Sequence, residues 1–515
     1  YVTNPERLTK PLIRIKGKQK DLHPSIDFSN LHEYFREATW DEALDYAAKG
    51  FLDIKKKRNG KSNLAGFGSA KCSNEEAYLF QKLIRTGFNT NNVDHCTRLC
   101  HASSVAALLE TIGSGAVTAP FYEVEHSEVI IVIGANPTEN HPVAATFFKN
   151  AAKKGSKLIV MDPRGHALKK HATHMLQFKP GSDVALLNSI MHVIIEDDLF
   201  NDEYIKKQTS GFDDLRRHLK NYPPEIMEEQ TGIDANLIRE VAHLYAKTSK
   251  GIIFWGMGVS QHVHGTDNAR CLISLALMTG NVGRRGSGLH PLRGQNNVQG
   301  ASDAGLIPMM YPDYQLVEKD EKQSFFEKFW NTHLDNKKGL TVVEIMDAIH
   351  ENTIKGMYIL GENPAMSDPD LNHAREALQI LEHLVVQDIF LTETATYADV
   401  IFPASAWPEK NGTATNTNRQ VQMGRKALDA PGAAKEDWWI TNELGKRMGL
   451  DWSYEHPSEI YEEMSKTMPS LNNITWDRLE NENSVTYPSR SPTTPGDEIV
   501  FGDKFPNESG RGKFV

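Results

Sequence analysis

Short apolar runs rich in β-branched residues alternate along the chain with amphipathic helical patterns. The runs predict strands at Leu64–Gly68, Val129–Ile133, Lys157–Met161, Gly251–Trp255, Gly356–Leu360, Leu384–Gln387 and Val400–Phe402. The helical patterns predict helices at Asn74–Thr86, Pro142–Lys154, Val184–Asp197, Asp234–Thr248, Asp267–Thr279 and Asp370–Leu381. Strands that alternate with helices are typical of α/β folds with mainly parallel sheets. A length of 515 residues predicts about three domains at ~150 residues each.

Two stretches depart from this alternation. Residues 283–314 are rich in glycine and asparagine and show almost no periodicity. Loops of such length without secondary structure of their own are usually functional or disordered, so we expect a long loop of one of these two kinds there. Beyond about Asp451 the chain becomes polar, and we expect loop structure.

The pattern contains an internal echo. Residues 130–137 (IIVIGANP) resemble residues 357–364 (MYILGENP), and each copy is followed by a helix and by a strand that ends in Asp, at Asp162 and Asp388. A glycine at the end of one strand and a carboxylate at the end of the next suit a nucleotide, with the backbone near phosphates and the carboxylate on ribose or base. Two ordinary βαβ units that share Asn-Pro turn chemistry would look the same.

Composition and net charge indicate which classes of protein this chain can belong to. Hydrophobic residues make up 39% and charged residues 24% of the chain, as in ordinary globular proteins. The longest apolar runs are of strand length, which argues against membrane insertion, and a net charge of −10 argues against nucleic-acid binding. Four cysteines without Cys-x2-Cys spacing fit a reducing, intracellular setting and provide no iron–sulfur or structural zinc site.

One of these cysteines stands in a chemically promising place. Cys100 precedes His101 at a predicted loop-to-helix junction, where Ser103 and Ser104 are plausible N-cap residues. The positive end of a helix dipole lowers the pKa of a thiol, and histidine exchanges protons near neutral pH. A lone cysteine is also commonly an inert buried residue, and Cys96 with Cys100 could form a chelating pair.

A second dense feature is residues 291–303 (PLRGQNNVQGASD), where amides and glycines surround Arg293. Such a loop offers many hydrogen-bonding groups, and the planar guanidinium matches a carboxylate, although a solvated polar loop would have the same composition. The segment Gly256-Met257-Gly258-Val259-Ser260-Gln261 lacks the third glycine of the dinucleotide fingerprint, which argues against direct NAD binding.

Taken in order along the chain, these motifs resemble those of the formate dehydrogenase catalytic subunit of the molybdopterin oxidoreductases. The matching motifs are Arg98-Leu99-Cys100-His101, Gly134-Ala135-Asn136-Pro137, Met161-Asp162-Pro163-Arg164, Pro180-Gly181-Ser182-Asp183, the Arg293–Asp303 loop, Gly361-Glu362-Asn363-Pro364 and residues 406–413 (AWPEKNGT). The resemblance implies a multi-domain α/β fold with two related, doubly wound nucleotide-binding domains. It also implies Mo or W held between two pterin guanine dinucleotides, which would explain the echo.

The resemblance assigns roles position by position. It implies that Cys100 ligates the metal, that His101 is the adjacent proton acceptor, and that Arg293 clamps the carboxylate of formate. It further implies dinucleotide contacts at Asn136, Asp162, Arg164, Gly181, Asp183, Met257, Gln261, Gln295, Gly361, Glu362, Asn363, Gln387 and Asp388. Thiolate is a soft ligand and suits such a metal.

The resemblance also predicts a domain division. We expect 1–95 with 296–405 to form one dinucleotide-binding domain and 96–295 the second. We expect 406–500 to be the remainder of the domain that carries the N-terminal cluster, and 501–515 to begin a C-terminal domain that covers the pterin. The four-Cys segment for a [4Fe–4S] cluster and a lysine on the electron path, usual in this group, are absent before Tyr1. The chain is therefore expected to be truncated at both ends and to bind its cofactor poorly alone.

The expected activity is oxidation of formate to CO2, with electrons passed to the cluster of the full-length protein and then to iron–sulfur or NAD/flavin-linked partner subunits in the cytoplasm. Two alternatives remain open. One is another molybdopterin oxidoreductase, such as a nitrate reductase, and the other is a non-catalytic relic that keeps the fold. Cys100 followed by His101, with Arg293 in its loop, favours formate.

Overall fold

The chain forms two compact units. The computed structural model describes residues 1–515 apart from residue 23 and residues 58–62. Unit 1 consists of Tyr1–Arg98, Gln295–Asn416 and Gln420–Pro495, and unit 2 consists of Leu99–Gly294, Thr417–Arg419 and Gly496–Val515. The finer division into four parts stays a prediction.

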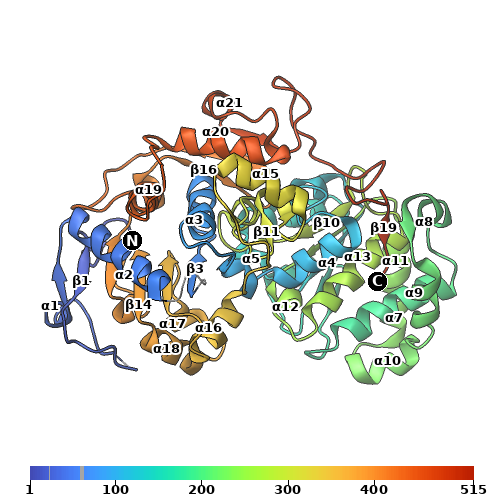
Figure 1. Ribbon diagram of the computed structural model, residues 1–515. Helices are drawn as coiled ribbons and strands as arrows, with labels where there is room; N and C mark the ends of the chain where they lie inside the picture. Colours follow the sequence, from blue (N-terminus) through green and yellow to red (C-terminus); the bar gives the residue numbers. More distant parts are fainter. Residues whose placement is uncertain (23, 58–62) are drawn as a thin grey trace. The chain divides into compact units, whose positions relative to one another are not determined.

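Unit 1 is built around a seven-stranded sheet (Figure 1). Its strand order is β2-β1-β15-β14-β13-β3-β4, in which β15, β14, β13, β3 and β4 run parallel and β1 and β2 pair antiparallel at one edge. The bounds are β1 Leu12–Arg14, β2 Phe35–Glu37, β3 Leu64–Gly68, β4 Val93–His95, β13 Gly356–Leu360, β14 His383–Asp388 and β15 Val400–Pro403. A smaller antiparallel sheet contains β16 (Gly412–Thr415), β17 (Gln420–Gly424) and β18 (Ser484–Thr486), and β11 (Met310–Tyr311) pairs with β12 (Gln315–Leu316).

Several helices of unit 1 contribute buried apolar residues to one large core. Helix α3 begins with a capping box in which the Ser73 side chain accepts from the backbone N–H of Glu76, and the Glu76 carboxylate accepts from that of Ser73. The helices are α1 Leu31–Tyr34, α2 Trp40–Lys57, α3 Asn74–Thr86, α14 Val298–Asp303, α15 Asp320–Trp330, α16 Val342–His350, α17 Pro364–Ser367, α18 Leu371–Ile380, α19 Asp437–Arg447, α20 Pro457–Thr467 and α21 Trp476–Glu482.

Unit 2 is built around a five-stranded sheet in which every pairing is parallel. Its order is β10-β9-β5-β6-β7, with β5 Val129–Ile133, β6 Lys157–Met161, β7 His174–Leu176, β9 Gly251–Trp255 and β10 Gly288–Pro291. Alternate residues of β5 enter different cores, Ile131 and Ile133 on one face and Ile130 and Val132 on the other. Both faces are therefore buried, which explains why the strand is a continuous apolar run.

Helices supply the two apolar layers of unit 2 (Figure 1). Residues of α4, α7, α11 and α13 pack in one core, and residues of α6 pack in the other. The bounds are α4 Ala102–Ile112, α5 Pro137–Asn140, α6 Pro142–Lys153, α7 Asp183–Glu196, α8 Asp202–Gln208, α9 Phe212–Leu219, α10 Pro224–Thr231, α11 Ala235–Ala246, α12 Met257–Ser260 and α13 Gly265–Met278. The short strands β8 (Thr209–Ser210) and β19 (Gly512–Lys513) pair with each other. Within the described part of the chain, no helix has the length and apolar character needed to cross a membrane.

The expected α/β class with mainly parallel sheets is confirmed, and the long periodic elements lie where the pattern predicts them. Two local predictions of loop structure are wrong in part. Residues 283–314 contain β10 and α14 and are largely buried, and the chain beyond Asp451 forms α20 and α21. In both places tertiary packing orders segments that show weak periodicity. The helix after Cys100 also begins differently, with His101 as its N-cap and no side-chain cap from Ser103 or Ser104.

The last residue of α14 is Asp303, whose carboxyl group is buried. Asp303 is 4% exposed and accepts hydrogen bonds from Gln299 Nε2 at 2.7 Å and from Tyr487 Oη at 2.8 Å. Burial raises the pKa of Asp303 to about 7, since the charged form loses its hydration. The folded state therefore holds a proton at this side chain that the unfolded chain releases at lower pH.

We expect this proton to make the stability of unit 1 depend on pH. The contribution is fully present below the ordinary aspartate pKa of about 4 and is lost as pH rises to about 7. Asp303→Asn should flatten this decline by at most about 4 kcal/mol, measured by denaturant unfolding at a series of pH values. The exposed Asp451→Asn is the matched control, and an unchanged pH slope in Asp303→Asn would contradict the assignment.

Candidate functional site

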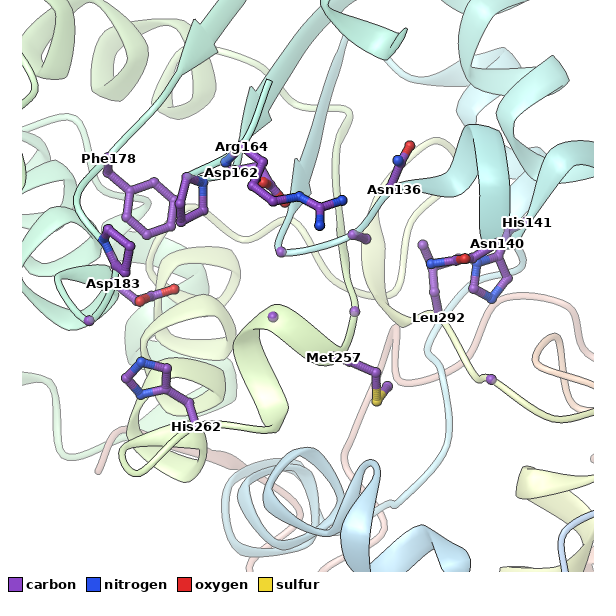
Figure 2. A pocket seen from close by; sticks show the side chains of 18 residues that line it. Asn136, Asn140, His141, Asp162, Arg164, Phe178, Asp183, Met257, His262 and Leu292 are labelled. Carbon is purple, nitrogen blue, oxygen red and sulfur yellow. Dashed lines mark hydrogen bonds between the residues drawn. The ribbon is translucent and has the colours of Figure 1, made fainter. Parts of the chain in front are cut away.

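A cavity of about 730 Å³ lies in unit 2 at the carboxyl edge of its parallel sheet (Figure 2). Gly134 follows β5, Asp162 follows β6, Gly256 follows β9 and Leu292 follows β10, and all four line it. Loops that follow parallel strands meet at one edge, which is where α/β folds bind ligands. The volume is in the range of small-molecule sites.

Most of the residues expected to contact a dinucleotide in this half of the chain line the cavity. They are Asn136, Asp162, Arg164, Gly181, Asp183 and Met257. Gln261 does not line it, and its side-chain amide instead donates to the backbone carbonyl of Leu99. Gln295 belongs to unit 1 and lines neither this cavity nor the corresponding cavity of unit 1.

The backbone of the first turn is shaped for close approach. Gly134 has a φ of +56°, and a Cβ added there would lie 2.7 Å from the backbone nitrogen of Val259. Glycine alone fits this position without strain. The next turn is fixed by Asp162, whose Oδ1 accepts from the backbone N–H of Arg164 at 2.8 Å. The cavity therefore combines exposed backbone with a carboxylate and a guanidinium at neighbouring positions.

Cys100 lies next to this cavity. It is half-buried between a 3-10 turn (Cys96–Leu99) and α4, whereas the other three cysteines are buried, and all four are thiols. Its Sγ lies 3.2 Å from Sδ of Met257, and a Cβ added to Gly294 would come within 3.9 Å of the thiol. Met257 and Gly294 both line the cavity. Among the described residues no cluster of three His, Cys, Asp or Glu side chains could hold a metal ion.

His101 is fully buried, and both of its ring nitrogens have partners. Nε2 lies 2.8 Å from the carbonyl oxygen of Leu292, and Nδ1 lies 3.4 Å from Ser104 Oγ and 3.3 Å from Ser260 Oγ. A carbonyl only accepts, so Nε2 carries the hydrogen. Burial, assisted by the charge of Arg293, lowers the pKa of His101 to about 3, and the ring is neutral.

Arg293 is also buried, at 5% exposure, and follows β10. One guanidinium nitrogen donates to the carbonyl of Gly115 at 2.5 Å. The Arg293 carbonyl accepts from Nε2 of His141 at 2.6 Å. A guanidinium in such dry surroundings interacts with an anion much more strongly than one in water. The structure thus brings Cys100, His101 and Arg293 into one unit, and their expected roles stay predictions.

A second cavity, of about 480 Å³, lies at the carboxyl edge of the parallel strands of unit 1. It lies where β13, β14 and β15 end and is lined by four of the expected residues, Gly361, Asn363, Gln387 and Asp388. Burial raises the pKa of Asp388 to about 6. Glu362 does not line this cavity: it is buried and accepts a hydrogen bond from Ser69 Oγ.

The turns of the two cavities have matching conformations. Asn136 and Asn363 are N-caps of the short helices α5 and α17, with φ of −114° and −127° and a proline at the next position. The glycines two residues earlier, Gly134 and Gly361, have φ of +56° and +67°. The echo in the sequence is therefore an echo in structure, placed at the carboxyl edge of a parallel sheet in each unit.

Sequence reasoning missed several side chains that line these cavities. In unit 2 they include His141, Phe178 and His262, and in unit 1 they include Lys71, Cys72, Trp407, Lys410 and Asp437. Lys410 and Trp407 stand inside residues 406–413, a motif that the resemblance singled out without giving any residue a role. The other positions carry no local pattern, because they reach the cavities only through the fold.

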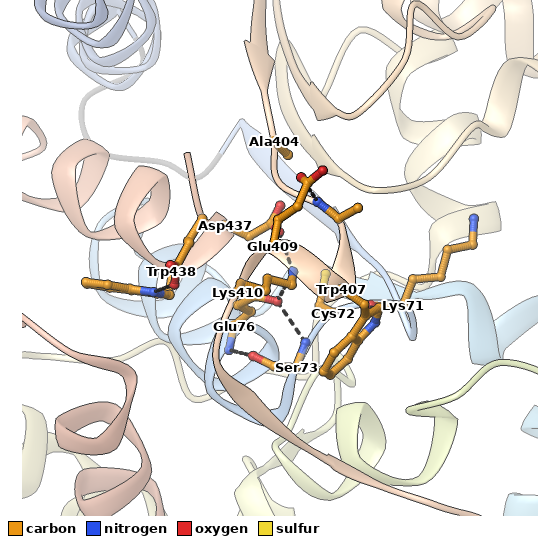
Figure 3. A network of polar contacts seen from close by, with 12 residues as sticks. Lys71, Cys72, Ser73, Glu76, Ala404, Trp407, Glu409, Lys410, Asp437 and Trp438 are labelled. Carbon is orange, nitrogen blue, oxygen red and sulfur yellow. Dashed lines mark hydrogen bonds and ion pairs between the residues drawn. The ribbon is translucent and has the colours of Figure 1, made fainter. Parts of the chain in front are cut away.

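Lys410 organises a buried polar network beside the cavity of unit 1 (Figure 3). Its Nζ lies 2.7 Å from Glu76 Oε2 and 2.6 Å from Asp437 Oδ2. The other oxygen of Asp437 accepts from Gln387 Nε2 at 2.7 Å, and Gln387 Oε1 accepts from the hydroxyl of Tyr358. Burial alone would lower the pKa of Lys410, but the carboxylates of Asp437 and Glu76 outweigh it and raise that pKa, so Lys410 remains charged. This network fixes which way the Gln387 amide faces at the cavity.

Comparison with known proteins agrees with this architecture. A family model described as molybdopterin oxidoreductase matches residues 7–447. The F420-dependent formate dehydrogenase subunit alpha of Methanocaldococcus jannaschii is 41% identical over 515 residues, which cover 100% of this chain and 73% of that protein. A putative formate dehydrogenase of Staphylococcus aureus is 38% identical over 514 residues, covering 100% of this chain and 50% of that protein.

A solved structure supports the fold. Acetylene hydratase from Pelobacter acetylenicus superposes with a TM-score of 0.77 at 22% sequence identity, over 99% of this chain and 70% of that chain. This likeness concerns the fold alone. The family model and the relatives confirm the resemblance found in the motifs, and the chain belongs to the molybdopterin oxidoreductase family.

Proposed function

We propose that this protein oxidises formate to CO2 at a Mo or W centre ligated by Cys100 and held by two pterin guanine dinucleotides. The observation that carries the proposal is the arrangement in unit 2: the Cys100 thiol contacts a residue that lines a nucleotide-sized cavity, and the buried guanidinium of Arg293 belongs to the same unit. Relatives at about 40% identity that are named formate dehydrogenase alpha subunits support the choice of substrate.

The residues present fit the cofactor. In unit 2 the first dinucleotide would be held by Asn136, Asp162, Arg164, Gly181, Asp183 and Met257, which combine backbone amides, a guanidinium and carboxylates around one cavity. In unit 1 the second would be held by Gly361, Asn363, Gln387 and Asp388. Gln261, Gln295 and Glu362 lie outside the linings of these cavities, and we assign them no direct contact. A carboxylate can accept from the N–H groups of guanine or the hydroxyls of ribose.

Within the reaction, the protein has to orient a very small anion and keep water away. Formate loses one proton and two electrons as its C–H bond breaks and CO2 forms, and the bound metal would accept the electrons. Arg293 would hold the carboxylate with two parallel N–H groups, in surroundings of low dielectric. Such fixed orientation accounts for a large part of catalysis with small substrates.

His101 is retained in the proposal as the adjacent proton acceptor. Nδ1 is the atom that would take the proton, since Nε2 already carries a hydrogen that it donates to Leu292. The hydroxyls of Ser104 and Ser260 lie within reach of Nδ1. Burial lowers the pKa of His101 to about 3, so the ring is neutral and its Nδ1 carries no proton before the reaction.

Electrons would leave through a [4Fe–4S] cluster of the full-length protein toward iron–sulfur or NAD/flavin-linked partner subunits. The names of the relatives as alpha subunits support the existence of such partners. The thiol state of all four cysteines fits a reducing, cytoplasmic compartment.

The proposal is tested on the purified full-length protein. Mo and W are measured by elemental analysis, the pterin by its fluorescence after oxidation, and activity by reduction of a dye with formate or its oxidation with nitrate. We expect metal, pterin and formate-dependent reduction. Nitrate turnover without formate turnover would favour a nitrate reductase, and the absence of metal and pterin would indicate a non-catalytic relic.

Replacing Arg293, the proposed clamp on the formate carboxylate, should lower the catalytic efficiency of formate oxidation. Arg293→Lys keeps the charge but removes the planar pair of donors, so we expect kcat/KM for formate to fall about 100-fold or more at unchanged metal content. The exposed Arg217→Lys, which alters an ion pair with Asp214 in the same unit, is the matched control. Wild-type kinetics in Arg293→Lys would refute the clamp.

Replacing the proposed ligand should separate metal chemistry from dinucleotide binding. Cys100→Ala removes the thiolate but leaves both cavities intact, so formate oxidation should fall at least about 1000-fold while pterin remains bound. Cys271→Ala, at a cysteine buried against Asn188 in unit 2, should keep its activity. Retained formate oxidation in Cys100→Ala would rule out the assigned ligation.

A further inference from the structure

Residues 292–294 form a short segment that we call the Arg293 loop. Its first two backbone carbonyls, those of Leu292 and Arg293, each accept a hydrogen bond from a histidine. Nε2 of His101 lies 2.8 Å from the carbonyl oxygen of Leu292, and Nε2 of His141 lies 2.6 Å from that of Arg293. Since a carbonyl cannot donate, both rings carry their hydrogen at Nε2 and point it at the loop. The two histidines come from different segments of unit 2, and His141 was not expected from the sequence.

The backbone around His141 is held rigidly. The residue ends α5 and begins α6: its N–H donates to the Pro137 carbonyl at 3.0 Å, and Pro142 follows it directly. A proline restricts the conformations of the residue before it. Within the described part of the chain, His141 Nδ1 is buried and makes no hydrogen bond, so the protein contact of this ring is the Arg293 carbonyl. The ring is therefore a fixed donor directed at one acceptor.

The Arg293 loop is anchored on its other sides as well. The Leu292 N–H donates to the Trp255 carbonyl at 2.8 Å, which continues the β9–β10 pairing, and the guanidinium reaches the Gly115 carbonyl. These contacts fix the position of the backbone before Arg293 and the position of the side chain. The peptide that joins Arg293 to Gly294 is oriented by His141, which binds its oxygen.

That peptide leads from Arg293 to a residue that lies close to Cys100. Gly294 is the residue whose added Cβ would approach Cys100 Sγ to 3.9 Å, and it lines the cavity together with His141. In Figure 2 His141 lies beside Leu292 at one end of the lining residues. A change in the orientation of the 293–294 peptide alters the backbone torsions of Arg293 and Gly294. It would therefore change the direction of the Arg293 side chain relative to the glycine that lies next to the thiol.

We propose that His141 is a positioning residue that sets the spacing between Arg293 and Cys100 by holding the Arg293 carbonyl. The expected effect on kinetics rests on the proposed function, whereas the expected effect on the conformation of the loop does not. His141 does not touch substrate in this role, and it acts through the backbone of the loop. A displacement of about 1 Å at a catalytic group commonly costs about 100-fold in rate.

The test uses three variants of the full-length protein. His141→Phe keeps an aromatic ring but has no donor, His141→Ala removes the ring, and His141→Gln places an amide N–H near the position of Nε2. His192→Phe is the matched control, since His192 is a histidine of unit 2 that also lies at hydrogen-bond distance, 2.8 Å, from a backbone carbonyl, that of Leu219.

We expect kcat/KM for formate to fall about 10- to 100-fold in His141→Phe and His141→Ala, mainly through a higher KM, with metal and pterin content unchanged. His141→Gln should recover most of the loss, and His192→Phe should leave both constants unchanged. Unaltered kinetics in His141→Phe, or a loss that His141→Gln does not recover, would overturn the proposal. Loss of pterin from all three variants would make His141 a wall of the cofactor cavity instead.

Hydrogen exchange gives a readout that does not depend on activity. The amides of residues 292–294 should exchange about 10-fold faster in His141→Phe than in wild type, and at the wild-type rate in His141→Gln. Unchanged exchange in His141→Phe would overturn the positioning role even if activity fell. If the parent protein shows this pattern of exchange but does not oxidise formate, the positioning role stands and the proposed function fails.

Discussion

In each unit the parallel strands all point the same way, so the loops that follow them meet at a single edge of the sheet. This constraint decides where the candidate functional residues lie. In unit 2 it brings Gly134, Asp162 and Gly256 together from strands far apart in the sequence, and in unit 1 it does the same for Gly361 and Asp388. Both cavities, and the matching turns around Asn136 and Asn363, follow from it.

A second constraint is that polar groups buried near these edges must be satisfied. In unit 1 Lys410 is held between Glu76 and Asp437, and the latter fixes the Gln387 amide. In unit 2 histidines bind consecutive carbonyls of the Arg293 loop. Such networks make a site rigid because each broken contact leaves a buried group without its partner. Lys410 and His141 in this way hold groups of the two sites without a proposed chemical role of their own, whereas His101 is also the proposed proton acceptor.

The sequence was most informative where periodicity was strong. Strands such as Val129–Ile133 and helices such as Asn74–Thr86 lie where their apolar spacing predicts them, and the αβ alternation was sufficient for the fold class. It was least informative for residues 283–314 and 457–482, which are ordered by burial against distant elements. Among the residues expected to contact the cofactor, Asp162 and Asp388 lie at strand ends and line the cavities. Gln261 and Glu362 instead make hydrogen bonds with Leu99 and Ser69.

By itself the sequence determined the class of fold and the internal echo and predicted the chemically important residues, because these depend on local pattern and on motifs. Only the tertiary structure decided which nitrogen of His101 carries the hydrogen, that Arg293 is buried, and that His141 holds its carbonyl. The reason is physical: hydrogen-bond direction and desolvation arise from contacts between segments distant in sequence. No local pattern records those contacts before the chain folds.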